Sequence, residues 1–128
     1  MIEEVYVSFD TAKLLKEKGF DEPCRRYWRN YSDFSFEHTK DFVSVKDVYL
    51  LAPTQQMVMR WLREVYNLNC EIGYDYELKW YWQIKSLTEV AEYDYPEMKV
   101  WQSSNAENVN TYEEACEAAI KYCLENLI

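Results

Sequence analysis

A run of alternating side chains from Cys70 to Lys85 constrains the fold more than any other part of this sequence. All even-numbered residues of the run are apolar or aromatic, and most odd-numbered residues are polar or charged. This period of two is typical of a β-strand with one buried face. A single strand over these residues would be about 50 Å long, which is too long for a small domain, so we expect the run to turn.

The length of that turn decides which side chains share a face. A loop with an odd number of residues around 76–79 keeps all the even-numbered aromatic rings of the run on one face. A two-residue loop would instead place Trp80 and Trp82 on the face of the sheet away from Ile72 and Tyr74. The run has no Asn-Gly or Asp-Gly pair, the usual signal of a two-residue hairpin, so the sequence favours the odd-length loop.

A third strand is expected after this hairpin. Residues 86–96 have the composition of a long acidic loop, and residues 97–102 have the pattern of a short strand. In that strand we expect Met98 and Val100 to point inward and Trp101 to point outward.

Three segments have the spacing of amphipathic helices. Residues 8–18 begin at a possible cap, Ser8 or Asp10, and stop at a glycine. Residues 53–67 begin with a proline, which suits the first turn of a helix, and carry one continuous apolar stripe. Residues 111–126 begin with Thr111 and Glu114, which form a capping box.

These elements predict an α+β fold. We expect a short antiparallel sheet of three to five strands, packed on one face by the three helices, in a single domain spanning residues 1–128. Residues 21–51 are harder to interpret. They suggest short strands near 26–31 and 42–50, with turns or loop at 32–33 and 38–41.

The charge of the chain restricts its partners. The net charge is −9, with 23 acidic residues, so we expect no direct binding to nucleic acid, which depends mainly on lysine and arginine. No stretch approaches the roughly 20 apolar residues of a membrane span, and the first residues lack the layout of a signal peptide. We therefore expect a cytoplasmic protein that does not enter a membrane, with its four cysteines reduced.

The sequence shows no catalytic, cofactor-binding or metal site. His38 is the only histidine, and no pattern around it resembles a nucleophile with its base, so we interpret it as a surface loop residue. The cysteines have no CxxC spacing, and two glycines cannot form a phosphate-binding loop. We therefore predict a protein that is not an enzyme.

Three segments of the chain, residues 6–24, 52–68 and 111–128, resemble a family of small uncharacterised proteins encoded by phages and mobile elements of gut anaerobic bacteria. The segments coincide with the three expected helices. The resemblance implies an origin in a mobile element, and it implies no activity, cofactor or functional residue.

Three functions from different classes are consistent with these features. The first is a non-enzymatic accessory protein that binds another protein, because the chain is rich in aromatic residues, at 17%, and lacks a catalytic set. The second is an acidic mimic of nucleic acid that inhibits a DNA-binding or defence protein of the host. The third is a small-molecule or enzymatic site lined by Trp80, Trp82 or Trp101 beneath the 86–96 loop.

A protein-contact face is expected on the side of the sheet that the helices leave open. Its predicted residues are Tyr81, Gln83, Lys85, Lys99 and Trp101.

Overall fold

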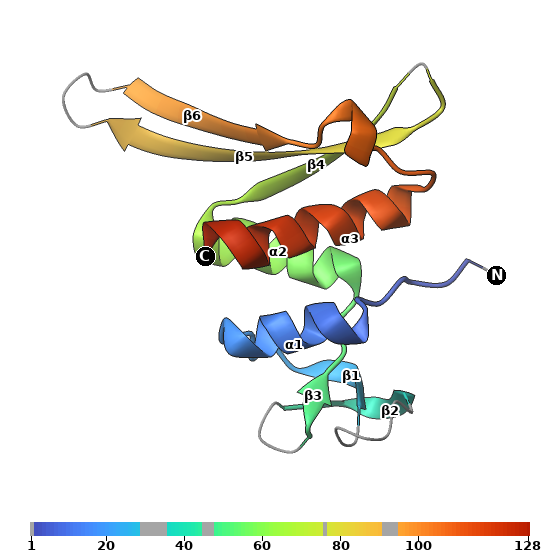
Figure 1. The fold of residues 1–128 in the computed structure, drawn as a ribbon. Coiled ribbons are helices and arrows are strands. Elements are labelled where there is room, and N and C mark those ends of the chain that lie inside the picture. Colours follow the sequence, from blue (N-terminus) through green and yellow to red (C-terminus); the bar gives the residue numbers. More distant parts are fainter. Residues whose placement is uncertain (1, 29–35, 45–47, 76, 91–94) are drawn as a thin grey trace.

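The fold is described by a computed structural model for residues 2–28, 36–44, 48–75, 77–90 and 95–128 (Figure 1). In these ranges the helices are α1 (Phe9–Glu17), α2 (Gln55–Tyr66) and α3 (Tyr112–Tyr122), and α3 continues into a π-helical turn, Cys123–Leu127. The strands are β1 (Cys24–Trp28), β2 (Phe36–Val43), β3 (Leu50–Leu51), β4 (Asn69–Tyr74), β5 (Trp80–Val90) and β6 (Tyr95–Gln102). A short 3-10 helix, Asn105–Glu107, follows β6. The predicted α+β fold is confirmed.

The strands form two antiparallel three-stranded sheets, in the orders β4-β5-β6 and β2-β1-β3. Helices separate the two sheets (Figure 1). Helix α3 packs on β4 and β5, and α2 packs on β4 and on α3, while α1 lies between α3 and β3. Buried side chains from all three helices and both sheets belong to one apolar cluster. Within the described ranges, no helix has both the length and the apolar character needed to cross a membrane.

Each helix begins at a side-chain cap. The hydroxyl oxygens of Ser8, Thr54 and Thr111 accept hydrogen bonds of 3.1–3.2 Å from backbone N–H groups three residues later. These bonds satisfy donors that a helix leaves unpaired at its first turn. Helix α2 ends at Asn67, whose φ of 55° is in the left-handed region that asparagine tolerates. The expected helices therefore occur where the sequence places them.

Two contacts tie the first helix to the last part of the chain. The backbone N–H of Ser8 donates to Glu117 Oε1 at 2.6 Å, and Lys18 Nζ donates to the carbonyl of Ile128 at 2.8 Å. Both contacts join residues at least 109 positions apart.

The hairpin between β4 and β5 has the predicted odd-length loop. Tyr74 pairs with Trp80, so residues 75–79 form the connection. Cys70, Trp82 and Ile84 consequently share the face that α3 covers, and all three are buried. The expectation drawn from the alternating run is confirmed.

The prediction for residues 86–102 was wrong in two respects. Strand β5 continues to Val90 and pairs there with Tyr95, so most of the expected 86–96 loop is strand. Trp101 pairs with Ile84, and directly paired residues of antiparallel strands share a face, so Trp101 packs against the core. Met98 and Val100 occupy the opposite face, where they are 55% and 45% exposed. Inward and outward are therefore reversed in β6.

Residues 38–41 also differ from their expected loop, because they lie inside β2 and His38 pairs with Arg26 of β1. Among the described residues of the expected strand at 42–50, strand is found at its two ends, in β2 and β3. The turn expected at 32–33 lies outside the described residues.

Candidate binding groove

The structure does not bring the five predicted contact residues together. Tyr81, Gln83 and Lys85 lie on the face of β5 that the helices leave open, whereas Lys99 and Trp101 lie on the opposite face of β6. The open sheet face consists of Glu71, Gly73, Tyr81, Gln83, Lys85, Met98, Val100 and Gln102.

Polar pairs across strands occupy much of the open sheet face. Gln83 Nε2 donates to Gln102 Oε1 at 3.1 Å, and Lys85 Nζ lies 2.9 Å from Glu71 Oε2. Such pairs are typical of the solvated face of an antiparallel sheet. Tyr81, Gln83 and Lys85 thus lie on a face whose polar side chains are explained by its exposure to solvent.

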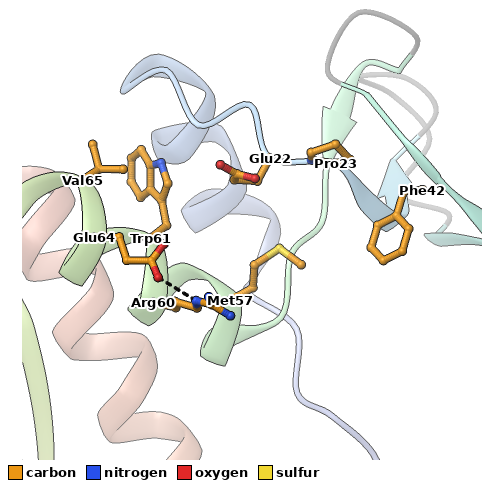
Figure 2. A pocket seen from close by; sticks show the side chains of 8 residues that line it. All are labelled: Glu22, Pro23, Phe42, Met57, Arg60, Trp61, Glu64 and Val65. Carbon is orange, nitrogen blue, oxygen red and sulfur yellow. Dashed lines mark hydrogen bonds and ion pairs between the residues drawn. The ribbon is translucent and has the colours of Figure 1, made fainter.

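A different surface has the shape of a binding site. A groove with a volume of about 620 Å³ lies between α2 and the segment leading into β1, with β2 at its far end (Figure 2). Its lining residues are Glu22, Pro23, Phe42, Met57, Arg60, Trp61, Glu64 and Val65.

One side of the groove comes from a single stripe of α2. Met57, Trp61 and Val65 recur every four residues, which places them on one side of the helix. Trp61 is only 7% exposed, because Phe20 and Tyr66 pack edge-on against its ring at 5.2 Å. Val65 is 57% exposed at the end of the same stripe. The stripe therefore runs from the core out to the solvent.

The facing side comes from distant parts of the sequence. Pro23 precedes β1, and Phe42 lies near the end of β2 with its side chain 55% exposed. Figure 2 shows Phe42 across the groove from the α2 residues. A second hollow of about 280 Å³ shares Phe42 and Met57 with the first, so the two hollows adjoin along α2.

Charged groups surround this apolar surface. Arg60 Nε lies 2.9 Å from Glu64 Oε1, and this bond raises the pKa of the arginine (Figure 2). The guanidinium of Arg25 lies over the Phe42 ring, 4.7 Å from its centroid. Glu22 is exposed, and in Figure 2 it lies between Pro23 and Trp61. The groove thus combines apolar walls with two carboxylates at its edge.

The described lining residues contain no nucleophile paired with a base. Cys24 lines the second hollow, but burial, and secondarily the nearby charge of Glu22, raises the pKa of its thiol to about 12. The thiol is therefore protonated near neutral pH and is a poor nucleophile. In the described part of the chain, no group of three or more histidine, cysteine or acidic side chains is placed to hold a metal ion.

The expected small-molecule site near the tryptophans is not where this groove lies. Trp80 packs against Tyr74 and Tyr112, and Trp82 packs against Tyr122. Trp82 does line a separate hollow of about 430 Å³ beside α3, among mostly polar side chains. Sequence reasoning missed the groove because its residues come from three separated segments. The single available signal was Val65, which continues the apolar stripe of α2 close to the end of the helix.

Comparisons with protein-family models, with curated proteins and with solved structures give no match to this chain. The resemblance to proteins of phages and mobile elements therefore stays a prediction.

Proposed function

We propose that this chain is a non-enzymatic protein-binding module whose groove receives apolar side chains from a basic, amphipathic segment of another protein. The observation that carries the proposal is the pair of exposed apolar side chains, Phe42 and Val65, at the edges of a groove lined by Met57 and Trp61. Large apolar side chains exposed together around a concave surface are characteristic of interaction sites.

The exposure of the groove favours a polypeptide over a small molecule. Pockets for small ligands usually bury most of the ligand surface. Here Phe42 and Val65 are each more than half exposed, so a ligand of that size would keep much of its surface in water. An amphipathic helix instead lays one apolar face into such a groove and keeps its polar face in solvent.

Charge complementarity favours a basic partner. The chain carries a net charge of −9, and the exposed Glu22 lies at the edge of the groove, where Glu64 is paired with Arg60. Lysine and arginine residues flanking the apolar anchors would be attracted to this surface, which raises the association rate and disfavours acidic competitors.

The experiment uses a synthetic helical peptide of leucine and lysine, with a leucine and glutamate peptide of the same pattern as its counterpart. Binding is followed by two-dimensional NMR of the labelled protein. The expected result is that only the lysine peptide shifts the Trp61 indole N–H and the signals of Met57 and Val65. The substitution Val65→Lys should weaken binding at least tenfold, because it removes an apolar contact and adds a repelling charge.

The matched control is Val100→Lys, which makes the same change at a similarly exposed valine on the open sheet face. This variant should bind like the wild type. The proposal is wrong if the two peptides bind equally, if the shifts map to Met98 and Val100, or if both lysine variants weaken binding to the same extent.

The alternative of a nucleic-acid mimic rests on the net charge of −9 and on the expected origin in a phage or mobile element. Among the described carboxylates, Glu64 and Glu71 are ion-paired with Arg60 and Lys85, which reduces the negative charge that they present. The groove therefore supports protein binding better than it supports mimicry.

A further inference from the structure

Two cysteines far apart in the sequence meet beneath the β4-β5-β6 sheet. Cys70 is the second residue of β4, and Cys123 begins the π-helical turn after α3. Their Sγ atoms are 3.9 Å apart, and the two side chains are 7% and 0% exposed. All four cysteines of the chain lie in described residues, and this is the one pair whose sulfurs are in contact.

We infer that Cys70 and Cys123 form an oxidation site, at which a hydroperoxide converts the two thiols into an intramolecular disulfide. This inference is independent of the groove, which the two residues do not line.

The reaction balances with a hydroperoxide as the oxidant. The sulfur of Cys70 attacks one peroxide oxygen and breaks the O–O bond, which gives a sulfenic acid on Cys70 and releases water or an alcohol. The sulfur of Cys123 then attacks the sulfenic sulfur, forms the S–S bond and breaks the S–O bond, and the hydroxyl leaves as water with the proton of the Cys123 thiol. Two thiols are oxidised by two electrons, and one peroxide is reduced.

The geometry assigns the first step to Cys70. Cys70 retains a small exposed fraction as a residue, 7%, and Cys123 has none, so a small peroxide reaches Cys70 more readily. The hydrogen bond from the Cys123 thiol, with help from the charge of Arg63, lowers the pKa of Cys70. The same bond and burial raise the pKa of Cys123, so its thiol ionises less readily than that of Cys70 and does not react first.

Cys24 and Cys116 have neither a thiol in contact nor a lowered pKa. Cys24 has the thioether of Met57 as its sulfur neighbour at 3.9 Å, and its pKa is raised to about 12. Burial raises the pKa of Cys116 to about 11. Neither thiol has another thiol in contact, so neither has a partner for a disulfide in this fold.

The disulfide would fasten the end of α3 to the edge strand β4. It would link residues 53 positions apart, and a cross-link over a loop of that length restricts the unfolded chain strongly. The oxidised protein should therefore unfold at a higher temperature than the reduced protein, by on the order of 10 °C.

The experiment treats the folded wild-type protein with hydrogen peroxide and analyses it by intact mass and peptide mapping. The expected product has lost about 2 Da, contains a peptide pair joined at Cys70 and Cys123, and returns to the starting mass with dithiothreitol. The variants Cys24→Ser and Cys116→Ser should form the same link. The inference is overturned if the folded protein forms sulfinic acids, pairs other cysteines, or stays reduced while peroxide oxidises the exposed Met98.

The order of the two steps has its own test. In Cys123→Ala, a dimedone probe should label Cys70 as a sulfenic acid, while in Cys70→Ala it should leave Cys123 unlabelled. The reverse labelling overturns the assignment. Circular dichroism is the control that checks whether both variants fold. If either variant does not fold, the peptide map of the wild-type protein still tests whether the disulfide forms.

Discussion

The effect of Gly73→Ala on the free energy of unfolding should change sign when the Tyr81 ring is removed. Gly73 and Tyr81 are directly paired across β4 and β5, and the Tyr81 ring lies over the glycine. A Cβ atom at position 73 would lie 2.1 Å from Cζ of that ring, whereas ordinary contact begins at 3.4 Å. The ring must therefore move by about 1.3 Å or more, the difference between those two distances.

The magnitude follows from two opposing effects. The contact of the Tyr81 ring across the strands stabilises the fold by about 1.5 kcal/mol, and displacing the ring removes this stabilisation. Replacing glycine by alanine within a strand is favourable by about 0.5–1 kcal/mol. Gly73→Ala alone should thus lower the free energy of unfolding by about 0.5–1 kcal/mol. In a Tyr81→Ala background, where no ring is displaced, it should raise that free energy by about 0.5–1 kcal/mol.

Urea unfolding followed by far-UV circular dichroism measures both effects in a double-mutant cycle. The control is a Gln83→Ala background, which alters the same face without touching Gly73, and there the sign should match the wild type. If Gly73→Ala has the same effect with and without the Tyr81 ring, the steric argument fails.

Two further predictions concern helix and loop ends. Thr111→Ala should lower the free energy of unfolding by about 1 kcal/mol, and Thr111→Ser by only a few tenths, because serine keeps the oxygen that accepts from Glu114 N–H; equal losses in urea unfolding would contradict this. The backbone N–H of Lys79, with further hydrogen bonds from Glu77 and Asn108, lowers the pKa of Asp75. A lowered pKa in the folded state stabilises the protein above the unfolded pKa, near pH 4, and the stabilisation disappears as the pH falls through the folded pKa. As the pH falls from about 5 to about 3, the free energy of unfolding of Asp75→Asn should therefore decrease less than that of the wild type. If the urea midpoints of the two proteins differ by the same amount at both pH values, the carboxylate of Asp75 does not stabilise the fold in this way.

The elements that the sequence predicted well are those with local signals. Ser8 and Thr111 are caps whose hydrogen bonds lie within three residues, so the sequence could suggest both without the fold. The cap of α2 is Thr54, so Pro53 lies just before the helix and not in its first turn. The odd-length loop after Tyr74 followed from the alternation, which shows which residues share a face, and from the absence of an Asn-Gly or Asp-Gly pair.

The predictions that failed depended on pairing between strands. The outward position assigned to Trp101 assumed a loop at 86–96, and extending β5 to Val90 changed the register. The acidic character of that segment suggested a loop, but β4 pairs with β5 only as far as Lys85. Beyond that residue the strand has a single described neighbour, β6.

The candidate site was invisible for a related reason. Phe42 and Met57 face one another across the groove only because β2 pairs with β1 and α2 follows β3. No local sequence pattern predicts that these two residues lie close together. The solvated pairs of Gln83 and Lys85, by contrast, lie on a face whose openness was expected, and only their partners came from the fold.

The contacts between α1 and the residues from 117 onward also determine when this protein can finish folding on the ribosome. Ser8 and Lys18 must wait for Glu117 and Ile128, which are synthesised 109 and 110 residues later. At roughly 5–20 residues per second, that delay is about 5–20 seconds. Throughout it, Leu15 and the rest of the apolar side of α1 lack their final cover. During synthesis, α1 is therefore the segment for which a chaperone has the longest opportunity to bind.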